Sequence, residues 1–425
     1  MSAPVPLRLL PDTAEVGSSG ELRIGGCDVT ALAAEHGTPL FVYDEAHLRR
    51  RCREAVAAFG PDRVVYATKA FLCTAMARLA HDEGLLLDVA TGGELFVALH
   101  AGVPADRCVM HGNNKSLDEL RMALSEGVRH VVVYSFDELD RLDALRAEGL
   151  PRPRLQVRVT PGVHAHTHEY IATGQDDSKF GFNLSNGDAL RAIERIRASG
   201  VGELVGVHCH IGSNVFEASS FAKAAEVMAG FVRPLDLPEL TLGGGLGVAY
   251  VTDEEAPTIT TWGSVLLDAC AALGVRSRVY VEPGRAIVGA AAVTVYTVGT
   301  VKRIPSVRTY VAVDGGMSDN PRPVLYGSGY EAFLVRDVLA ERREQVRVVG
   351  KHCESGDVLI FRAAVPAGAA VGDLLAMPVT GAYGHSMGSN YNKVLRPAVV
   401  FVHDGDARLV VRRETFDDLV RGDVG

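Results

Sequence analysis

Short apolar runs alternate with segments of helical periodicity over the first two thirds of the chain. Between about residues 40 and 285, eight runs have the length and composition of buried strands. They are Val64–Ala67, Leu86–Val89, Cys108–His111, His130–Tyr134, Leu155–Val159, Leu204–Cys209, Glu239–Leu242 and Arg278–Val281. Helix-period segments such as Ala75–Asp82, Leu117–Glu126 and Phe136–Glu148 separate most of them. Eight strand–helix units in about 250 residues predict an α/β fold, a parallel sheet closed into a (β/α)8 TIM-like barrel.

The pattern changes after Arg285, where runs rich in Val, Thr and aromatic residues are separated by turn residues. The expected strands are Val293–Val301, Thr309–Val313, Val346–Val349, Val358–Ile360, Leu374–Val379, Ala398–His403 and Arg408–Arg412, with one helix near Ala332–Glu344. This pattern is typical of a β-sandwich or small β-barrel. The short run Leu22–Ile24 is expected to join it. We therefore predict a barrel over 38–285 and a mostly β domain formed by 1–37 plus 286–425.

Composition narrows the function classes. The 425 residues carry a formal net charge of -9 and no dense Lys/Arg run, which disfavours a nucleic-acid-binding groove. No apolar run approaches the roughly 20 residues of a membrane span. The seven cysteines are scattered without CxxC spacing, which favours reduced thiols. We expect a soluble cytoplasmic protein that binds neither nucleic acid nor membrane.

Chemically active residue types follow the predicted barrel strands. In chain order, the residues at or just after the ends of these strands are Lys69, then Asp88 and Glu94, then His111, then His210 and Ser213, then the run Gly243-Gly244-Gly245-Leu246-Gly247, and finally Glu282. Functional side chains of such barrels come from the carboxyl ends of the strands. These residues are therefore expected on one rim.

Three of these features fit a pyridoxal phosphate site. Lys69 can form a Schiff base, although a lone lysine at a strand end is more often solvated. The glycine run exposes backbone N–H groups that suit a phosphate, but it lacks a P-loop ending and comes too late for a dinucleotide fold. Glu282 can pair with a protonated pyridine nitrogen, or alternatively with Arg285. Together they predict carbanion chemistry on an amino acid.

Two further groups have alternative interpretations. His208 and His210 share one strand face, so a metal pair completed by His164, His166 or His168 is an alternative. The matching carboxylate or thiolate spacing is missing, and we predict no metal. Cys353 has polar, turn-forming neighbours, which predicts a semi-exposed thiol able to return a proton to a carbanion rather than a core cysteine.

Several motifs, in order from about residue 38 to 400, resemble diaminopimelate decarboxylase, a fold-type-III pyridoxal-phosphate family. The matching segments are Tyr66-Ala67-x-Lys69-Ala70, His208-x-His210-Ile211-Gly212-Ser213, the glycine run, Glu282-Pro283-Gly284-Arg285, Val313-Asp314-Gly315-Gly316-Met317-Ser318-Asp319-Asn320, Cys353-Glu354-Ser355-Gly356-Asp357 and Gly381-Ala382-Tyr383. Several of them also occur in ornithine and arginine decarboxylase relatives. Pro321 departs from the family pattern, and it could shift the loop that carries Arg322.

The resemblance implies a function and a set of roles. The reaction would convert meso-2,6-diaminopimelate to L-lysine and carbon dioxide, the last step of lysine biosynthesis. Lys69 would hold the cofactor and His210 would stack on its ring. The remaining cofactor contacts would be Asp88, Ser213, Gly243, Gly244, Gly245, Glu282, Gly284, Arg285 and Tyr383.

Substrate recognition and assembly are implied in the same way. Arg285, Arg322, Tyr326, Glu354 and Tyr383 would bind the substrate, and Cys353 would donate the proton. Cys353 and Glu354 would serve the other subunit of a homodimer with shared active sites. The alternatives are a related decarboxylase acting on another basic or carrier-bound amino acid, a cofactor-holding regulator, and a racemase. The stretch Ala172–Phe180 is expected to act as a lid.

Overall fold

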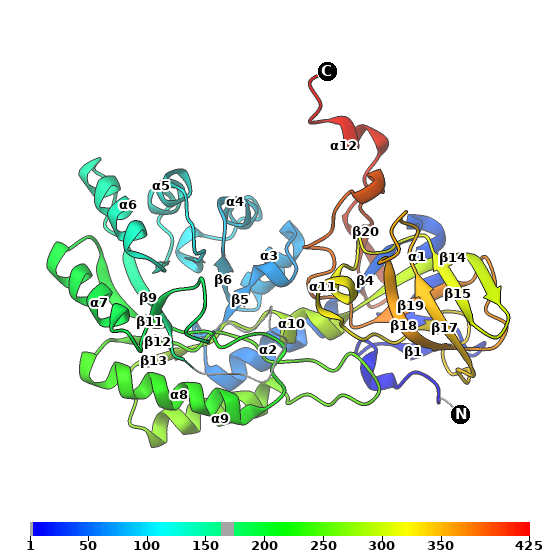
Figure 1. Cartoon of the computed structure of the whole chain (residues 1–425), viewed down its shortest axis with the longest axis horizontal. Helices are drawn as coiled ribbons and strands as arrows, with labels where there is room; N and C mark the ends of the chain where they lie inside the picture. The colour runs from blue at the N-terminus through cyan, green and yellow to red at the C-terminus, as the bar shows by residue number, and fades with distance from the viewer. Residues whose placement is uncertain (1–2, 163–173) are drawn as a thin grey trace. The chain divides into compact units, whose positions relative to one another are not determined.

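The computed structural model describes residues 3–162 and 174–425, and the chain divides into two compact units (Figure 1). The barrel unit comprises Arg51–Val248 and Ala256–Ala286. The β unit comprises Met1–Arg50, Ala249–Glu255 and Ile287–Gly425. The segments 38–50 and 249–255 thus belong to the β unit, although the range 38–285 includes them. The bounds derived from the sequence stay a prediction of domain boundaries.

Eight parallel strands form the barrel, which confirms the predicted fold class. In chain order they are β5 (Val65–Ala67), β6 (Leu86–Val89), β7 (Cys108–Met110), β8 (His130–Val133), β9 (Arg154–Thr160), β11 (Glu203–His208), β12 (Glu239–Thr241) and β13 (Arg278–Tyr280). Each pairs with the next in sequence order, and the short β10 (Phe182–Asn183) adds to β9. A parallel bridge from Val64 to Val281 brings the first and last strands together. All eight expected strands are present.

Helices alternate with the barrel strands, beginning with one that precedes β5 (Figure 1). They are α2 (Glu45–Phe59), α3 (Thr74–Asp82), α4 (Gly92–His100), α5 (Leu117–Glu126), α6 (Phe136–Ala147), α7 (Asp188–Ser199), α8 (Ala218–Val232), α9 (Ile259–Ala272) and α10 (Arg285–Val288). Local sequence sets their ends. In α5, Ser116 and Glu119 form a reciprocal capping box, and Gly127 adopts the left-handed conformation that ends the helix.

Side chains fill the barrel interior in layers. Val65, Leu86, Val109, Val132 and Tyr280 form a buried apolar cluster. A polar layer centres on Glu239, which accepts a hydrogen bond from Gln156 Nε2 at 2.8 Å and lies 3.2 Å from His130 Nε2. Buried polar groups need such partners, so the layer fixes the register of the strands that it joins.

The β unit contains one large sheet with the strand order β18-β17-β15-β14-β4-β20-β21, and β19 and β16 lie off this path. Its strands are β4 (Leu40–Asp44), β14 (Ala292–Ile304), β15 (Arg308–Val313), β16 (Phe333–Leu334), β17 (Glu344–Val349), β18 (Val358–Val365), β19 (Leu374–Pro378), β20 (Ala398–His403) and β21 (Asp406–Val411). The long strand β14 pairs antiparallel with β4, β15 and β19. Strand β14 therefore connects the strands β18, β17 and β15 on one side to β4, β20 and β21 on the other.

The amino-terminal residues complete this unit. Strands β1 (Glu15–Val16), β2 (Leu22–Ile24) and β3 (Cys27–Asp28) form a small antiparallel sheet before α1 (Val29–His36). Leu22 and Ile24 are buried in a cluster with Val42 and Val293. The remaining helices are α11 (Arg322–Tyr326), α12 (Phe416–Val420) and the 3-10 turns η1 (Leu7–Leu9), η2 (Thr68–Ala70), η3 (Ala105–Arg107), η5 (Arg233–Leu235), η6 (Gly289–Ala291) and η7 (Tyr391–Lys393).

The helix expected near Ala332–Glu344 is wrong. Phe333 and Leu334 form β16, which pairs with β19, and turns follow as far as β17. The side chains of Phe333 and Leu334 are both buried. Pairing with the apolar strand β19 favours the extended conformation here over the expected helix. Among the described residues, no helix is both long and apolar enough to cross a membrane.

Candidate active site

The predicted site residues of the barrel unit lie at the carboxyl ends of its strands. Lys69 lies in η2 directly after β5, and Asp88 lies near the end of β6. His208 ends β11, the glycine run follows β12, and Glu282 follows β13. Because β5 lies between β6 and the β13 end, Lys69, Asp88 and Glu282 come from three neighbouring strands.

Glu282 is the buried acid of this rim, with 7% of its surface exposed. His208 Nε2 lies 2.7 Å from one carboxylate oxygen, and His111 Nε2 lies 3.0 Å from the other. Burial opposes ionisation, but His208 and His111 outweigh it and hold the pKa of Glu282 well below its usual range. The sequence-based alternative, a pairing with Arg285, did not anticipate these two partners.

The other acids of the rim behave differently. Burial raises the pKa of Asp88, whose carboxylate lies 3.9 Å from His111 Nε2. Burial also raises the pKa of Glu94, which accepts a hydrogen bond from the Ala90 N–H at 2.6 Å. Glu282 is thus the carboxylate of this rim that its surroundings keep ionised.

Lys69 and His210 present complementary groups. The Lys69 side chain is exposed at the rim. His210 Nδ1 accepts a hydrogen bond from the Gly244 N–H at 3.2 Å, so its proton lies on Nε2. Burial and then the charge of Lys69 hold the pKa of His210 well below its usual range, and the ring is neutral. A neutral imidazole can lie against a positively charged ring, such as a pyridinium, without charge repulsion.

The glycine run lies against neighbouring strand ends. A Cβ on Gly244 would lie 2.0 Å from the Glu282 carbonyl oxygen, and one on Gly245 would lie 2.2 Å from the Gly212 carbonyl oxygen. Gly245 also has a φ of 109°, which side chains rarely tolerate. The Glu282 N–H donates to the Gly243 carbonyl at 2.8 Å. Glycine is therefore required at these positions by packing as well as by any ligand.

Arg285 and Ser213 meet on the same rim. Arg285 Nη2 donates to Ser213 Oγ at 2.9 Å, and Gly284 packs against Ala67 directly before η2. A guanidinium beside a hydroxyl suits an oxyanion such as phosphate or carboxylate. The structure thus brings together the barrel residues that the sequence predicted.

In the β unit, Arg322 lies in an aromatic enclosure. It starts α11, is 3% exposed, and donates to the Tyr330 hydroxyl at 2.6 Å. Its guanidinium lies 4.2 Å from the centre of the Tyr250 ring. Burial disfavours the charge, but Tyr330 and Tyr250 outweigh it and raise the pKa of Arg322 above its ordinary value. Tyr326 and Tyr383 are half-buried, and Tyr383 has a φ of 67°.

Cys353 is exposed, as expected, whereas the other six cysteines are buried. Its backbone N–H donates to Asn392 Oδ1 at 3.1 Å, and His352 Nδ1 lies 3.3 Å from the same oxygen. The neighbouring Glu354 is also exposed. The thiol therefore lies on a loop that Asn392 holds through the backbone.

The two histidines of the alternative metal pair, His208 and His210, contact different groups. His208 contacts Glu282, whereas His210 accepts from Gly244. His208, His111 and Glu282 are grouped, with ligand atoms within 4.8 Å of one another. The two short carboxylate–imidazole contacts account for this grouping. His164, His166, His168 and residues 172–173 of the expected lid lie outside the described residues.

Residues that the sequence reasoning missed lie around the predicted ones. Tyr134 directly follows β8, so the strand-end rule could have found it. Arg158 lies within β9 and gave no such signal. Tyr250 contacts Arg322 through its ring face, and Asn392 contacts the backbone of Cys353 through its amide oxygen. No sequence motif marks either contact.

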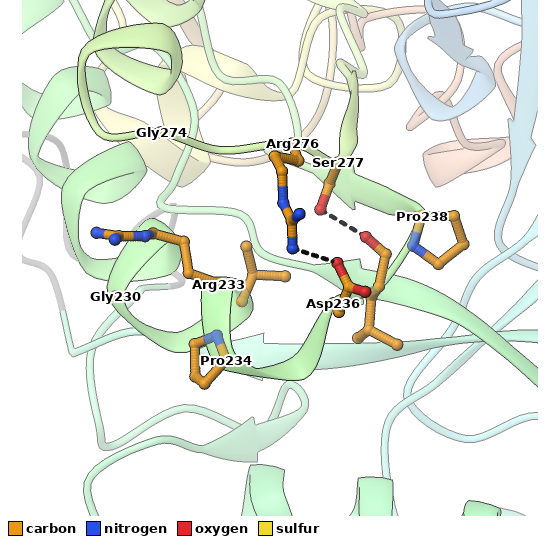
Figure 2. A pocket seen from close by; sticks show the side chains of 10 residues that line it. Gly230, Arg233, Pro234, Asp236, Pro238, Gly274, Arg276 and Ser277 are labelled. Carbon is orange, nitrogen blue, oxygen red and sulfur yellow. Dashed lines mark hydrogen bonds and ion pairs between the residues drawn. The ribbon is translucent and has the colours of Figure 1, made fainter.

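A separate hollow is lined by the turns that precede β12 and β13, at the ends of these strands away from the rim. Figure 2 shows its lining side chains. Its cavity volume is about 620 Å³, and Arg233, Asp236, Arg276 and Ser277 are among its lining residues. Arg276 pairs with Asp236 at 2.7 Å, and both side chains are exposed. Such surface pairs contribute little energy, so the hollow has no features of a reactive site.

Comparison with known proteins identifies the family. Residues 45–289 match the model of the pyridoxal-dependent decarboxylase pyridoxal-binding domain. The chain is 47% identical over 421 residues to the diaminopimelate decarboxylase of Mycobacterium tuberculosis, with 94% of each chain covered. It is 46% identical to that of Bacillus subtilis, with 98% of each covered. The chain belongs to the diaminopimelate decarboxylase family.

Solved structures of this family agree. The M. jannaschii diaminopimelate decarboxylase, in complex with L-lysine, superposes with a TM-score of 0.90 at 32% identity, covering 97% of this chain and 98% of that one. The Helicobacter pylori diaminopimelate decarboxylase, also with L-lysine, gives a TM-score of 0.85 at 30% identity, covering 93% and 98%. The predicted fold-type-III architecture is confirmed.

The cofactor of this family is pyridoxal 5'-phosphate, and the rim has groups that fit it. Glu282 is an ionised acid suited to a pyridinium nitrogen. His210 offers a neutral ring, Lys69 an accessible amine, and the Arg285–Ser213 pair an oxyanion site.

Gly244→Ala should disrupt the rim, because its methyl group must displace the chain that carries Glu282. We expect a loss of about 2 kcal/mol or more of unfolding free energy and at least about tenfold weaker cofactor binding. Gly230→Ala is the matched control, since nothing lies within 4 Å of the added methyl group in α8. Urea unfolding and cofactor titration measure both effects, and equal behaviour of the two variants would contradict the packing argument.

Proposed function

We propose that the protein decarboxylates meso-2,6-diaminopimelate to L-lysine and carbon dioxide, the last step of lysine biosynthesis. One observation carries the proposal: an accessible amine, a neutral imidazole and an ionised buried carboxylate, those of Lys69, His210 and Glu282, share one rim of a barrel. Membership of the family and the L-lysine in two relatives' structures support the choice of substrate.

In this proposal, different barrel residues bind the cofactor and orient it. Pyridoxal phosphate, when bound, supplies an aldehyde for the substrate amine and a ring that takes up the electron pair left by carbon dioxide. Lys69 tethers the cofactor between turnovers, and His210 lies against its ring. Glu282 holds a proton at the ring nitrogen. Asp88, Ser213, the glycines 243–245, Gly284, Arg285 and Tyr383 complete its binding.

Selectivity comes from the far end of the substrate. Arg285, Arg322 and Tyr326 bind the distal carboxylate, and Glu354 binds the distal ammonium group. The Tyr250 and Tyr330 rings hold Arg322 charged and oriented. A substrate that lacks one of these charges leaves buried polar groups unpaired, which costs several kcal/mol, or about a hundredfold or more in kcat/KM.

The proposed proton donor acts across a subunit interface. Cys353 donates a proton to the carbon that has lost carbon dioxide, so one C–C bond is replaced by one C–H bond. We propose a homodimer in which Cys353 and Glu354 act in the site of the other subunit. The exposure of the Cys353 thiol supports a role outside its own core.

Three finer predictions remain part of the proposal. The barrel domain spans 38–285, and the β domain spans 1–37 plus 286–425. The enzyme works in the cytoplasm, as the scattered cysteines indicate. Within the expected lid Ala172–Phe180, the described residues 174–180 cover the site.

Purified protein should release equal amounts of L-lysine and carbon dioxide from meso-diaminopimelate only with pyridoxal phosphate. Against L-lysine, L-ornithine and L-arginine, kcat/KM should be at least about a hundredfold lower. Lys69→Ala should abolish turnover. Lys223→Ala, which alters an exposed lysine of the same unit, should not. Faster turnover of ornithine or arginine would favour the alternative decarboxylase instead.

Mixed dimers test whether the sites are shared. Lys69→Ala and Cys353→Ala chains, co-expressed with different tags and purified through both, should recover about half the wild-type activity, because one of two sites is intact. Dimers carrying Cys353→Ala on both chains are the control and should stay inactive. Verified mixed dimers without recovered activity would contradict sharing.

A further inference from the structure

A line of buried polar contacts leads away from Glu282 to groups that the proposed reaction does not use. His111 follows β7, and its ring contacts one partner through each nitrogen. Nε2 lies 3.0 Å from Glu282 Oε1, and Nδ1 lies 3.0 Å from the Tyr134 hydroxyl. His111 is 4% exposed and Tyr134 is 6% exposed. Both partners therefore fix the plane of one imidazole.

The contact with Glu282 determines where His111 carries a proton. This contact is an ion pair by distance, since Nε2 has no hydrogen-bond partner among the described residues, and the carboxylates of Glu282 at 3.0 Å and Asp88 at 3.9 Å favour a proton on Nε2. Tyr134 decides the state of the other nitrogen. If the tyrosine oxygen accepts, Nδ1 also carries a proton and His111 is a cation.

The surroundings of Tyr134 favour an accepting oxygen. Arg158 Nη1 already donates to the hydroxyl at 3.2 Å. Lys115 Nζ lies 4.7 Å from the ring centre, held there by bonds to Glu138 Oε1 at 2.7 Å and the Val132 carbonyl at 2.7 Å. Burial raises the pKa of Tyr134, but Arg158, His111 and Lys115 outweigh it and lower the pKa. The lowered pKa favours the ionised form of Tyr134, whose oxygen can only accept hydrogen bonds.

The charges around His111 point the same way. Among the described residues, the titratable and charged groups that face it or act on it are Asp88, Tyr134, His208 and Glu282, and Arg158 reaches it only through Tyr134. Burial opposes the charged ring, but Asp88, Tyr134 and Glu282 outweigh it and raise the pKa of His111 to about 10. Burial lowers the pKa of His208 to about 4. Of the two imidazoles on Glu282, one is a cation and the other a neutral donor.

We propose that His111, fixed by Tyr134, is a protonated positioning residue that holds Glu282 as an aligned carboxylate. This inference rests on the proposed function, in which Glu282 faces the cofactor's ring nitrogen. A proton shared between Glu282 and that nitrogen can reside on either atom. A cation on the far carboxylate oxygen stabilises the carboxylate relative to the acid. His111 therefore shifts the shared proton onto the ring nitrogen.

Histidine NMR on the full-length protein without cofactor tests the charge directly. With nitrogen-15-labelled histidine, and with His111→Gln to assign the signal, His111 should be doubly protonated at pH 8. Tyr134→Phe should lower its pKa by about one unit or more, because the accepting oxygen is lost. Tyr280→Phe is the matched control: Tyr280 is 2% exposed, and its hydroxyl lies 3.5 Å from Glu239 Oε1, away from His111.

The ring nitrogen gives the second readout. In protein reconstituted with nitrogen-15-labelled pyridoxal phosphate, His111→Gln should move the ring signal from the pyridinium position towards that of neutral pyridine. The value of kcat should fall while the KM for diaminopimelate stays unchanged. A merely structural role would not move this signal in a folded protein.

The outcomes separate this inference from the proposed function. A neutral His111 at pH 8 in the wild-type protein would overturn the inference even if decarboxylation is normal, and it would do so even if Tyr134→Phe failed to fold. An unchanged ring signal in folded His111→Gln would also overturn it. The histidine titration needs neither cofactor nor substrate, so failure of the decarboxylation assay would leave its result readable.

Discussion

A carboxylate that is removed from water must find hydrogen-bonding or charged partners within the protein, and Glu282 finds two imidazoles on other strands. His208 reaches it from β11 and His111 from the end of β7. The strands around the barrel must therefore keep their register for the acid to stay ionised. The buried layer around Glu239 and the glycine packing beside Glu282 maintain that register from either side. The reactive rim is thus a consequence of barrel closure.

The β unit also stabilises a buried charge, but with different groups. Arg322 is buried without a short contact to a carboxylate among the described residues, and its charge is stabilised by a tyrosine hydroxyl and by tyrosine ring faces. Cys353 is held by the backbone through Asn392 while its thiol stays exposed. One unit presents an ionised acid and an amine, and the other presents a cation and a thiol. Glu282 and Arg322 thus carry the opposite charges that their proposed roles, at a pyridinium nitrogen and at a carboxylate, require.

Periodicity predicted the eight barrel strands and all seven expected strands of the β unit, because strand length and apolar composition are local properties. It failed at Ala332–Glu344, where the pairing of Phe333 with β19 decides the structure. Likewise β4 lies between β14 and β20, and no local signal distinguishes it from a barrel strand. The rim residues were found because strand ends converge. The partners of Glu282, and the aromatic enclosure of Arg322, depend on contacts between distant segments and could not be predicted.

The central claim is that Lys69 is the amine through which this barrel holds pyridoxal phosphate. Borohydride reduction of the reconstituted protein, followed by peptide mass spectrometry, measures this directly. The account predicts a phosphopyridoxyl group on the peptide containing Lys69, at about one group per chain. A label on another lysine, or no stable label on a protein that retains cofactor and activity, would contradict it.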